Sequence, residues 1–130
     1  MTNLIPYLNR RWSPEYNCWD FVREIYANEF HISLEPHAIA VAAVLSHSAD
    51  IVSEEAAKLD VWRVVENPQL GDVALLGKFN RSYHVGCMIT AATILHLPAS
   101  APSTAVPIHR LLSQFRSLTY YRHASILSRN

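Results

Sequence analysis

The spacing of apolar residues changes near residue 60, and this change constrains the fold more than any other feature of the chain. Before it, apolar residues recur every three or four positions in "EYNCWDFVREIY" (15–26), the period of an amphipathic helix. After it, short runs rich in Val, Ile and Leu are separated by turn residues, which is typical of antiparallel strands. The sequence therefore predicts an α+β fold, with helices first and a β-meander second.

Turn and capping residues give the expected bounds of these elements. Ser13 is expected to cap the first helix and Pro14 to lie in its first turn, so that Cys18 falls near the start of the helix. A loop is expected at 98–107, before a short helical patch at 108–115. The remaining expected elements are helices at 36–48 and 53–59 and strands at 60–66, 71–77, 83–90, 93–98 and 118–124.

Length and charge limit the classes of protein to consider. With 130 residues, the chain is expected to form one domain, 1–130, and a domain of this size buries roughly two-thirds of its unfolded surface. The formal net charge is zero and no block of like charges occurs, which argues against a nucleic acid or an acidic membrane as partner. The N-terminus lacks the apolar core of a signal peptide, and the longest apolar run (38–45) is too short to span a membrane. We therefore expect no membrane insertion.

The cysteines and histidines contain one pattern typical of catalysis. Cys18 and Cys87 are the two cysteines, too few for a disulfide framework and without the spacing of a zinc site. A thiol at a helix start is favoured as a thiolate by the helix dipole, although cysteine is also a common core residue. Strand alternation places His84 on the face opposite Cys87, and a tight connection brings His96 of the next strand within reach of His84. A helix cysteine with two strand histidines is the arrangement of a papain-like thiol hydrolase.

Four motifs in this order resemble the NlpC/P60 superfamily of cell-wall cysteine peptidases: "NCWDFVREIY", "GDVALL", "HVGCMI" and "ILH", the second histidine lying twelve residues after the first. The resemblance covers about residues 7–125. It implies a papain-like fold in which N-terminal helices pack on a small antiparallel sheet or barrel. It also implies that Cys18 is the nucleophile, His84 the general base and His96 the residue that orients the base.

The residues beside the cysteine differ from the common bacterial form. Many members have Asp before the cysteine and Ser after it, where this chain has Asn17 and Trp19. This variant looks like the short members encoded by tailed phages, which accompany the tail tip and act on peptidoglycan. The resemblance implies a protein made in the host cytoplasm and carried in the virion, with peptidoglycan stem peptides and tail-tip proteins as its partners.

The expected reaction is hydrolysis of an amide within a stem peptide or cross-link, such as the bond from D-Glu to diaminopimelate, without metal or cofactor. The Cys18 N–H, with the hydroxyl of Tyr16 or Tyr7, is expected to hold the oxyanion, and Asn17 and Trp19 are candidates for substrate contact. Two alternatives stay open: a catalytically silent structural or assembly protein of the phage tail, and a thiol acyltransferase or toxin amidase of the same fold.

Structural roles are expected for other residues that could carry chemistry. Cys87 is assigned to the core, Asp72 to a turn or strand start, and Asp20 to an ion pair with Arg23. The other histidines share no metal-ligand spacing and are assigned to surface or capping positions: His31, His37, His47, His109 and His123. Two roles are possible for the tryptophans: they line a substrate site or they pack in the core. The residues concerned are Trp12, Trp19 and Trp62.

Overall fold

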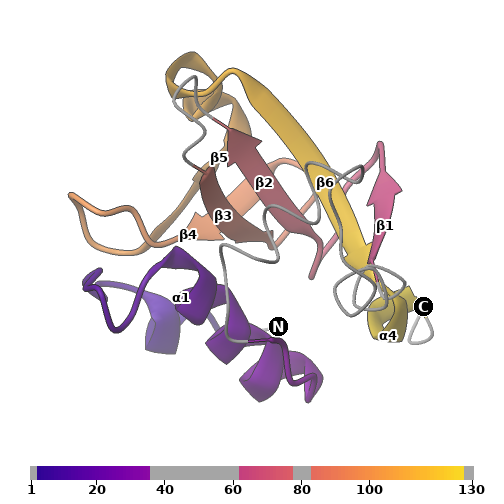
Figure 1. Ribbon diagram of the computed structural model, residues 1–130, viewed down its shortest axis with the longest axis horizontal. Helices are drawn as coiled ribbons and strands as arrows, with labels where there is room; N and C mark the ends of the chain where they lie inside the picture. Colours follow the sequence, from indigo (N-terminus) through magenta and orange to yellow (C-terminus); the bar gives the residue numbers. More distant parts are fainter. Residues whose placement is uncertain (1–2, 36–61, 78–82, 128–130) are drawn as a thin grey trace, which may run out of the picture.

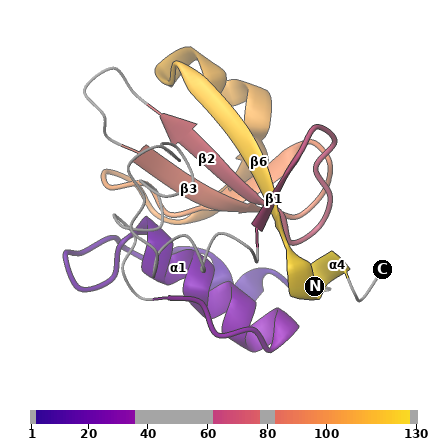
Figure 2. The ribbon, with the colours of Figure 1, turned by 45° about the vertical axis from the view of Figure 1, so that its right-hand side comes forward.

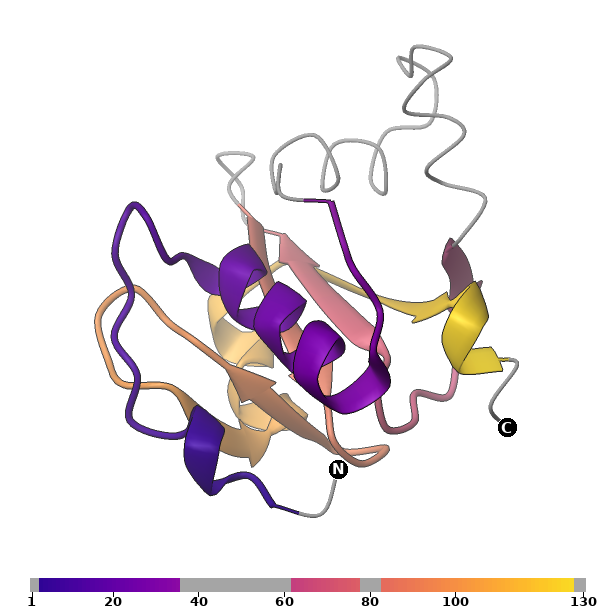
Figure 3. The ribbon, with the colours of Figure 1, turned by 90° about the horizontal axis from the view of Figure 1, so that it is seen from below.

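A computed structural model describes residues 3–35, 62–77 and 83–127 and shows one six-stranded antiparallel sheet with helices against it (Figure 1). Helix α1 (Cys18–Ile25) lies across one face of this sheet (Figure 3). The predicted α+β class is confirmed. The helices expected at 36–48 and 53–59 lie outside the described residues. No helix in the described ranges is long and apolar enough to cross a membrane.

Helix α1 begins at the cysteine itself because Asn17 caps it. The Asn17 side chain accepts the backbone N–H groups of Trp19 and Asp20, each at 3.0 Å. The Asp20 carboxylate in turn accepts the Asn17 N–H at 3.1 Å, which completes a capping box. This reciprocal cap fixes Cys18 as the first residue of the helix.

The expected start of this helix at Ser13 and Pro14 is wrong. Ser13 and Tyr16 exchange backbone hydrogen bonds of 3.1 and 3.0 Å and form a turn before the helix. The residue three positions after Ser13 is Tyr16, which cannot return a capping bond as a carboxylate does. At its other end α1 continues into a π-helical turn, η2 (Tyr26–Phe30), which His31 ends with a φ of 56°.

The strands follow one another in the sheet in the order β1-β6-β2-β3-β4-β5. Of the meander expected from the strands at 60–66, 71–77, 83–90 and 93–98, β2, β3 and β4 follow one another as predicted and β5 extends them. β6 lies between β1 and β2, so the expected pairing of the first two strands is wrong (Figure 2). The strands are β1 (Trp62–Val65), β2 (Val73–Gly77), β3 (Tyr83–Met88), β4 (Thr93–His96), β5 (Thr104–Pro107) and β6 (Ser117–His123).

The loop expected at 98–107 is wrong for its second half, which forms β5. Pro107 ends this strand, and among the described strands β5 lies at the edge beside β4, so the missing N–H of proline costs no bond inside the sheet. The helical patch expected at 108–115 forms two 3-10 turns. The short helical turns of the described residues are η1 (Ile5–Tyr7), η4 (Ile108–Arg110), η5 (Leu112–Gln114) and, at the C-terminal end, α4 (Ala124–Leu127).

The two faces of the sheet bury separate apolar clusters. The first lies between the sheet and α1 with η2, and its buried members include Phe21, Val22, Ile25, Tyr26, Val73, Leu75, Val85, Cys87, Leu95 and Leu97. The second lies on the opposite face and is closed by Ile108 and Leu111; its other buried members are Ala74, Leu76, Met88 and Ile94. Alternate residues of β3 therefore point to opposite faces, as predicted.

Candidate active site

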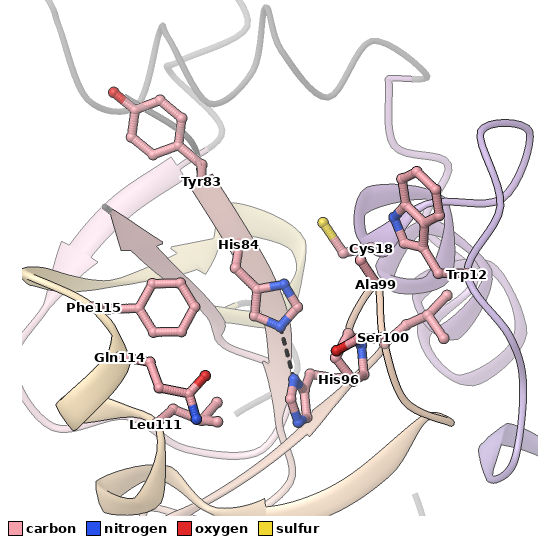
Figure 4. A pocket seen from close by; sticks show the side chains of 12 residues that line it. Trp12, Cys18, Tyr83, His84, His96, Ala99, Ser100, Leu111, Gln114 and Phe115 are labelled. Carbon is pink, nitrogen blue, oxygen red and sulfur yellow. Dashed lines mark hydrogen bonds between the residues drawn. The ribbon is translucent and has the colours of Figure 1, made fainter. Parts of the chain in front are cut away.

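The three residues of the predicted triad line one pocket of about 340 Å³. Figure 4 shows Cys18 at the start of α1, His84 on β3 and His96 at the end of β4, all facing this pocket. The structure thus brings together a thiol from the helical part of the chain and two imidazoles from the sheet. Trp12, Phe115 and Leu111 also line the pocket and come from loops and turns.

The two histidines are hydrogen-bonded to each other. His84 Nε2 and His96 Nδ1 lie 2.7 Å apart, and the rings meet edge to face with their centroids 5.0 Å apart and their planes at 79°. His96 pairs across the strands with Gly86, so His84 is its diagonal neighbour on the same face of the sheet. This contact confirms the prediction that His96 lies within reach of the His84 ring.

Gly86, the cross-strand partner of His96, leaves little room for a side chain. A Cβ at this residue would approach Ile94 Cδ1 to 2.5 Å and the Leu95 carbonyl oxygen to 3.0 Å. A side chain at position 86 would therefore displace the Ile94 side chain and press on the Leu95 carbonyl, both of which directly precede His96 on β4.

Burial determines the protonation of His96. Only 5% of this residue is exposed, and burial lowers the pKa of His96 below its ordinary value of 6.5. His96 is therefore neutral near pH 7, with one ring nitrogen free to accept a hydrogen bond. When His96 Nδ1 accepts the Nε2–H of His84, His84 Nδ1 carries the lone pair, and this is the nitrogen on the Cys18 side of the ring in Figure 4.

Cys18 reaches the site past the end of a strand. The pairing of β3 with β4 ends at Gly86 and His96, so Val85, which still pairs with Leu75 of β2, has no partner among the described residues on the β4 side. The thiol from α1 lies at this open edge, close to the Val85 backbone. A cysteine from the helix on one face of the sheet can therefore meet a histidine whose side chain belongs to the other face.

The thiol is not activated by its position on the helix alone. Burial raises the pKa of Cys18, and the nearby charge of Asp20 adds a smaller effect in the same direction. Backbone hydrogen bonds from Val85, Trp19 and Cys18 itself lower the pKa but do not cancel the effect of burial. The expectation that the helix start favours a thiolate is thus not met in the free protein, and a base must take the proton.

Three aromatic residues line the pocket besides the predicted triad, namely Trp12, Tyr83 and Phe115 (Figure 4). Phe115 stacks on His84, with ring centroids 5.8 Å apart and planes at 12°, and so fixes the plane of the imidazole. Trp12 lies on the other side of Cys18 in Figure 4 and was only a possible substrate wall. Phe115 closes the helical patch at 108–115, where no periodicity distinguishes a pocket residue from a core residue.

The two tyrosines proposed for the oxyanion do not line the pocket. The Tyr7 hydroxyl donates to the Glu29 carboxylate at 2.5 Å, and burial, with this hydrogen bond, raises the pKa of Tyr7 to about 12. The Tyr16 hydroxyl donates to Glu24 at 2.6 Å and accepts from Arg10 at 2.7 Å. The Tyr7 hydroxyl thus holds the N-terminal segment on η2 and the Tyr16 hydroxyl holds it on α1, so the structure does not support either hydroxyl as the oxyanion donor.

The two residues beside the cysteine also have structural roles. Asn17 uses its side-chain oxygen to cap α1. Trp19 is 2% exposed, packs in the first apolar cluster, and donates its indole N–H to the Glu35 carbonyl at 2.6 Å. Neither residue lines the pocket, so the structure does not support them as substrate contacts.

The other structural assignments hold for the described residues. Cys87 is fully buried, Asp20 pairs with Arg23 at 3.2 Å, and Asp72 is a fully buried carboxylate that accepts two hydrogen bonds from Arg122 at 2.9 and 2.8 Å. The histidines His37 and His47 lie outside the described residues. Of the others, His31 ends η2 and His109 is exposed. His123 is only 7% exposed, and its Nδ1 accepts the Ser125 N–H at 3.1 Å at the start of α4, which is a capping contact.

Comparison of the sequence with known proteins identifies no relative of this chain. No family model matches the chain, and no curated protein matches it. The described residues also contain no group of three or more His, Cys, Asp or Glu side chains placed to hold a metal ion. The resemblance to the NlpC/P60 superfamily remains a prediction that depends on the four sequence motifs.

Proposed function

We propose that this protein is a cysteine peptidase or amidase that cleaves peptide bonds of bacterial peptidoglycan. The observation that carries the proposal is the 2.7 Å contact between His84 and His96 in the pocket that also contains Cys18. A thiol, a base and a group that orients the base are the parts required for covalent acyl transfer. If the two histidines had only a structural role, the presence of a thiol in the same pocket would have no explanation.

The proposed reaction uses the tautomer in which His84 Nε2–H donates to His96 Nδ1. His84 Nδ1 takes the proton of the Cys18 thiol, and the sulfur attacks the carbonyl carbon to form a C–S bond. As the tetrahedral intermediate collapses, the C–N bond breaks and His84 returns the proton to the leaving amine. Water then attacks the thioester, again with His84 as base, which releases the acid and restores the thiol.

The oxyanion is assigned to the start of α1. Asn17 already accepts the N–H groups of Trp19 and Asp20, so the Cys18 N–H is the first-turn donor that we assign to the developing negative charge. Removing one such donor in hydrolases typically costs about 10²–10³ in rate. The hydroxyls of Tyr7 and Tyr16 are not needed in this scheme.

The substrate rests on the sequence motifs. Their resemblance to cell-wall cysteine peptidases supports peptidoglycan stems or cross-links, and the Asn-Cys-Trp variant supports a component of a phage tail tip. In that setting the protein loosens the wall during infection. A tail component that only binds its neighbours is the competing outcome of the test below.

The test is digestion of purified peptidoglycan followed by mass analysis of the released fragments. We expect the wild-type chain to release peptide fragments, and Cys18→Ala and His84→Ala to release none above background. Cys87→Ala is the matched control, since it removes the other thiol from a fully buried position outside the pocket. The proposal fails if the wild type releases no fragments, or if Cys18→Ala releases as many.

A further inference from the structure

Trp12 is a large apolar side chain that remains 39% exposed at the pocket. An isolated exposed tryptophan needs no explanation, but this one lies at a candidate nucleophile. Figure 4 shows the order Phe115, His84, Cys18 and Trp12 across the pocket, with the indole beyond the thiol as seen from the base. The side of Cys18 away from the histidines therefore ends in an aromatic wall.

The segment that carries Trp12 is held in place on one side by Ser103. The N–H of Asn9 donates to the Ser103 carbonyl at 3.0 Å, the N–H of Arg10 donates to Ser103 Oγ at 2.8 Å, and the Ser103 N–H donates to the Arg10 carbonyl at 2.9 Å. Asn9 also has a φ of 62°, a left-handed conformation that sets the direction of the chain here.

On the same side, the Arg10 guanidinium pairs with Glu24 of α1. On its other side the segment is held by the turn of Ser13 and Tyr16. Trp12 thus lies between two fixed points. A preorganised aromatic wall binds its ligand without first losing conformational freedom.

The reaction determines which half of a substrate meets this wall. Because His84 must protonate the leaving amine, that amine lies on the histidine side of Cys18. The acyl group stays bonded to sulfur and extends to the opposite side, where Trp12 lies. Resting on the proposed thiol hydrolysis, we propose that Trp12 forms an acyl-side subsite that selects substrates whose acyl half presents an uncharged, apolar or aromatic face. This favours a stem or cross-link bond other than that from D-Glu to diaminopimelate when the D-Glu α-carboxylate is free.

The chemistry of the pocket fits such an acyl group. Among the described residues that line it, none is Asp, Glu, Lys or Arg, and the histidines lie on the leaving-group side of Cys18 (Figure 4). The lining is mixed: Leu97, Pro98 and Ala99 are apolar, whereas Tyr83, Ser100 and Gln114 are polar but uncharged. Burying an unpaired charge against the Trp12 indole is unfavourable, whereas an apolar face gains by leaving water.

The test measures acylation of the full-length protein by p-nitrophenyl esters, whose release of p-nitrophenolate reports formation of the Cys18 thioester. Three esters are compared: butanoyl, succinyl as its anionic counterpart, and 3-phenylpropanoyl as an aromatic acyl group. We expect the wild type to prefer 3-phenylpropanoyl over butanoyl by about three- to tenfold, the range of an aromatic contact, and to disfavour succinyl. Trp12→Ala should lose the aromatic preference, and Trp12→Phe should keep part of it.

Ile5→Ala is the matched control, since Ile5 is a 76% exposed apolar residue of the same N-terminal segment and does not line the pocket. It should acylate as the wild type does. Equal preferences in wild type and Trp12→Ala would overturn the role of Trp12, as would a wild type that favours succinyl. Absence of any acylation dependent on Cys18 would instead overturn the proposed hydrolase. If Trp12→Ala does not fold, Trp12→Phe and the wild-type preferences decide the question.

Discussion

Replacement of His96 tests whether this residue orients the base through one particular nitrogen. The contact with His84 uses His96 Nδ1, which is attached directly to the Cγ of the ring. In asparagine the amide oxygen is attached at the same position, whereas in glutamine it is one bond further along and overlaps Nε2. We therefore expect His96→Asn to preserve the hydrogen bond to His84 better than His96→Gln does.

The expected magnitudes follow from the geometry of the contact. A hydrogen bond between neutral groups contributes about 0.5–1.5 kcal/mol, so His96→Gln, which misplaces the acceptor, should reduce kcat/KM by roughly tenfold. His96→Asn should lose about threefold or less. His96→Ala leaves the Nε2–H of His84 without its acceptor in a partly buried site, about 1–3 kcal/mol or roughly 5- to 150-fold. His84→Ala should lose the most, about 10²–10⁴-fold.

The assay is kcat/KM on peptidoglycan fragments or on an activated ester, together with thermal unfolding to compare stability. His123→Asn is the matched control because His123 is 7% exposed, close to the 5% of His96, and lies outside the pocket. It should change stability without changing kcat/KM of the folded fraction. Full activity of His96→Ala, or better activity of the glutamine than the asparagine variant, would refute the orienting role assigned to Nδ1.

The same residue gives an expected dependence of stability on pH. Burial lowers the pKa of His96 in the folded protein below 6.5, so the unfolded chain binds a proton more readily. The contribution of neutral His96 is therefore complete above pH 6.5 and is lost as the pH falls below it. Chemical denaturation of the wild type should show this loss of stability, and His96→Asn should show a shallower one. Equal slopes in both would contradict the assignment.

Three further predictions concern other contacts. Iodoacetamide should label Cys18 faster than Cys87, which is fully buried and whose pKa burial raises to about 12; peptide mapping after a short exposure decides between them, and equal labelling would count against a pocket thiol. Phe115→Leu should lower kcat more than Phe115→Tyr does, since the tyrosine ring can still stack on the base, and equal loss in the two variants would remove the role of stacking. Arg122→Ala should lower the free energy of unfolding by about 3–5 kcal/mol because it leaves Asp72 charged and fully buried; a loss below 1 kcal/mol in urea titration would contradict this.

Most strands could be predicted because their signals are local. Each of β1 to β4 is a short apolar run bounded by turn residues, and strand alternation depends only on neighbours in the sequence. The position of β6 could not be predicted, since its pairing of Ser117 with Gly77 joins residues far apart in the chain. β5 was missed because the prolines and serines around it also favour a loop.

The same distinction separates the parts of the site. His84 and His96 lie on adjacent strands joined by a short connection, so their contact could be inferred from register alone. The hydroxyls of Tyr7 and Tyr16 are bound by the carboxylates of Glu29 and Glu24. Nothing in the sequence pattern indicates these two pairs, so the roles proposed for the tyrosines could not be checked before the structure was known. Side-chain partners between distant segments require the folded arrangement.

The pKa of Cys18 shows how the effect of the helix dipole compares with the effect of burial. A helix dipole stabilises a charge at its end by about 0.3–1 kcal/mol at exposed sites, whereas removing a charge from water costs several kcal/mol. Burial therefore outweighs the helix, and the pKa of the resting thiol is raised. The same low-dielectric surroundings strengthen the attraction between a thiolate and an imidazolium, so the charged state becomes accessible only when the proton moves to His84. In the proposed reaction, activation of the Cys18 thiol thus depends on His84, and His84 depends on His96 to present the correct nitrogen.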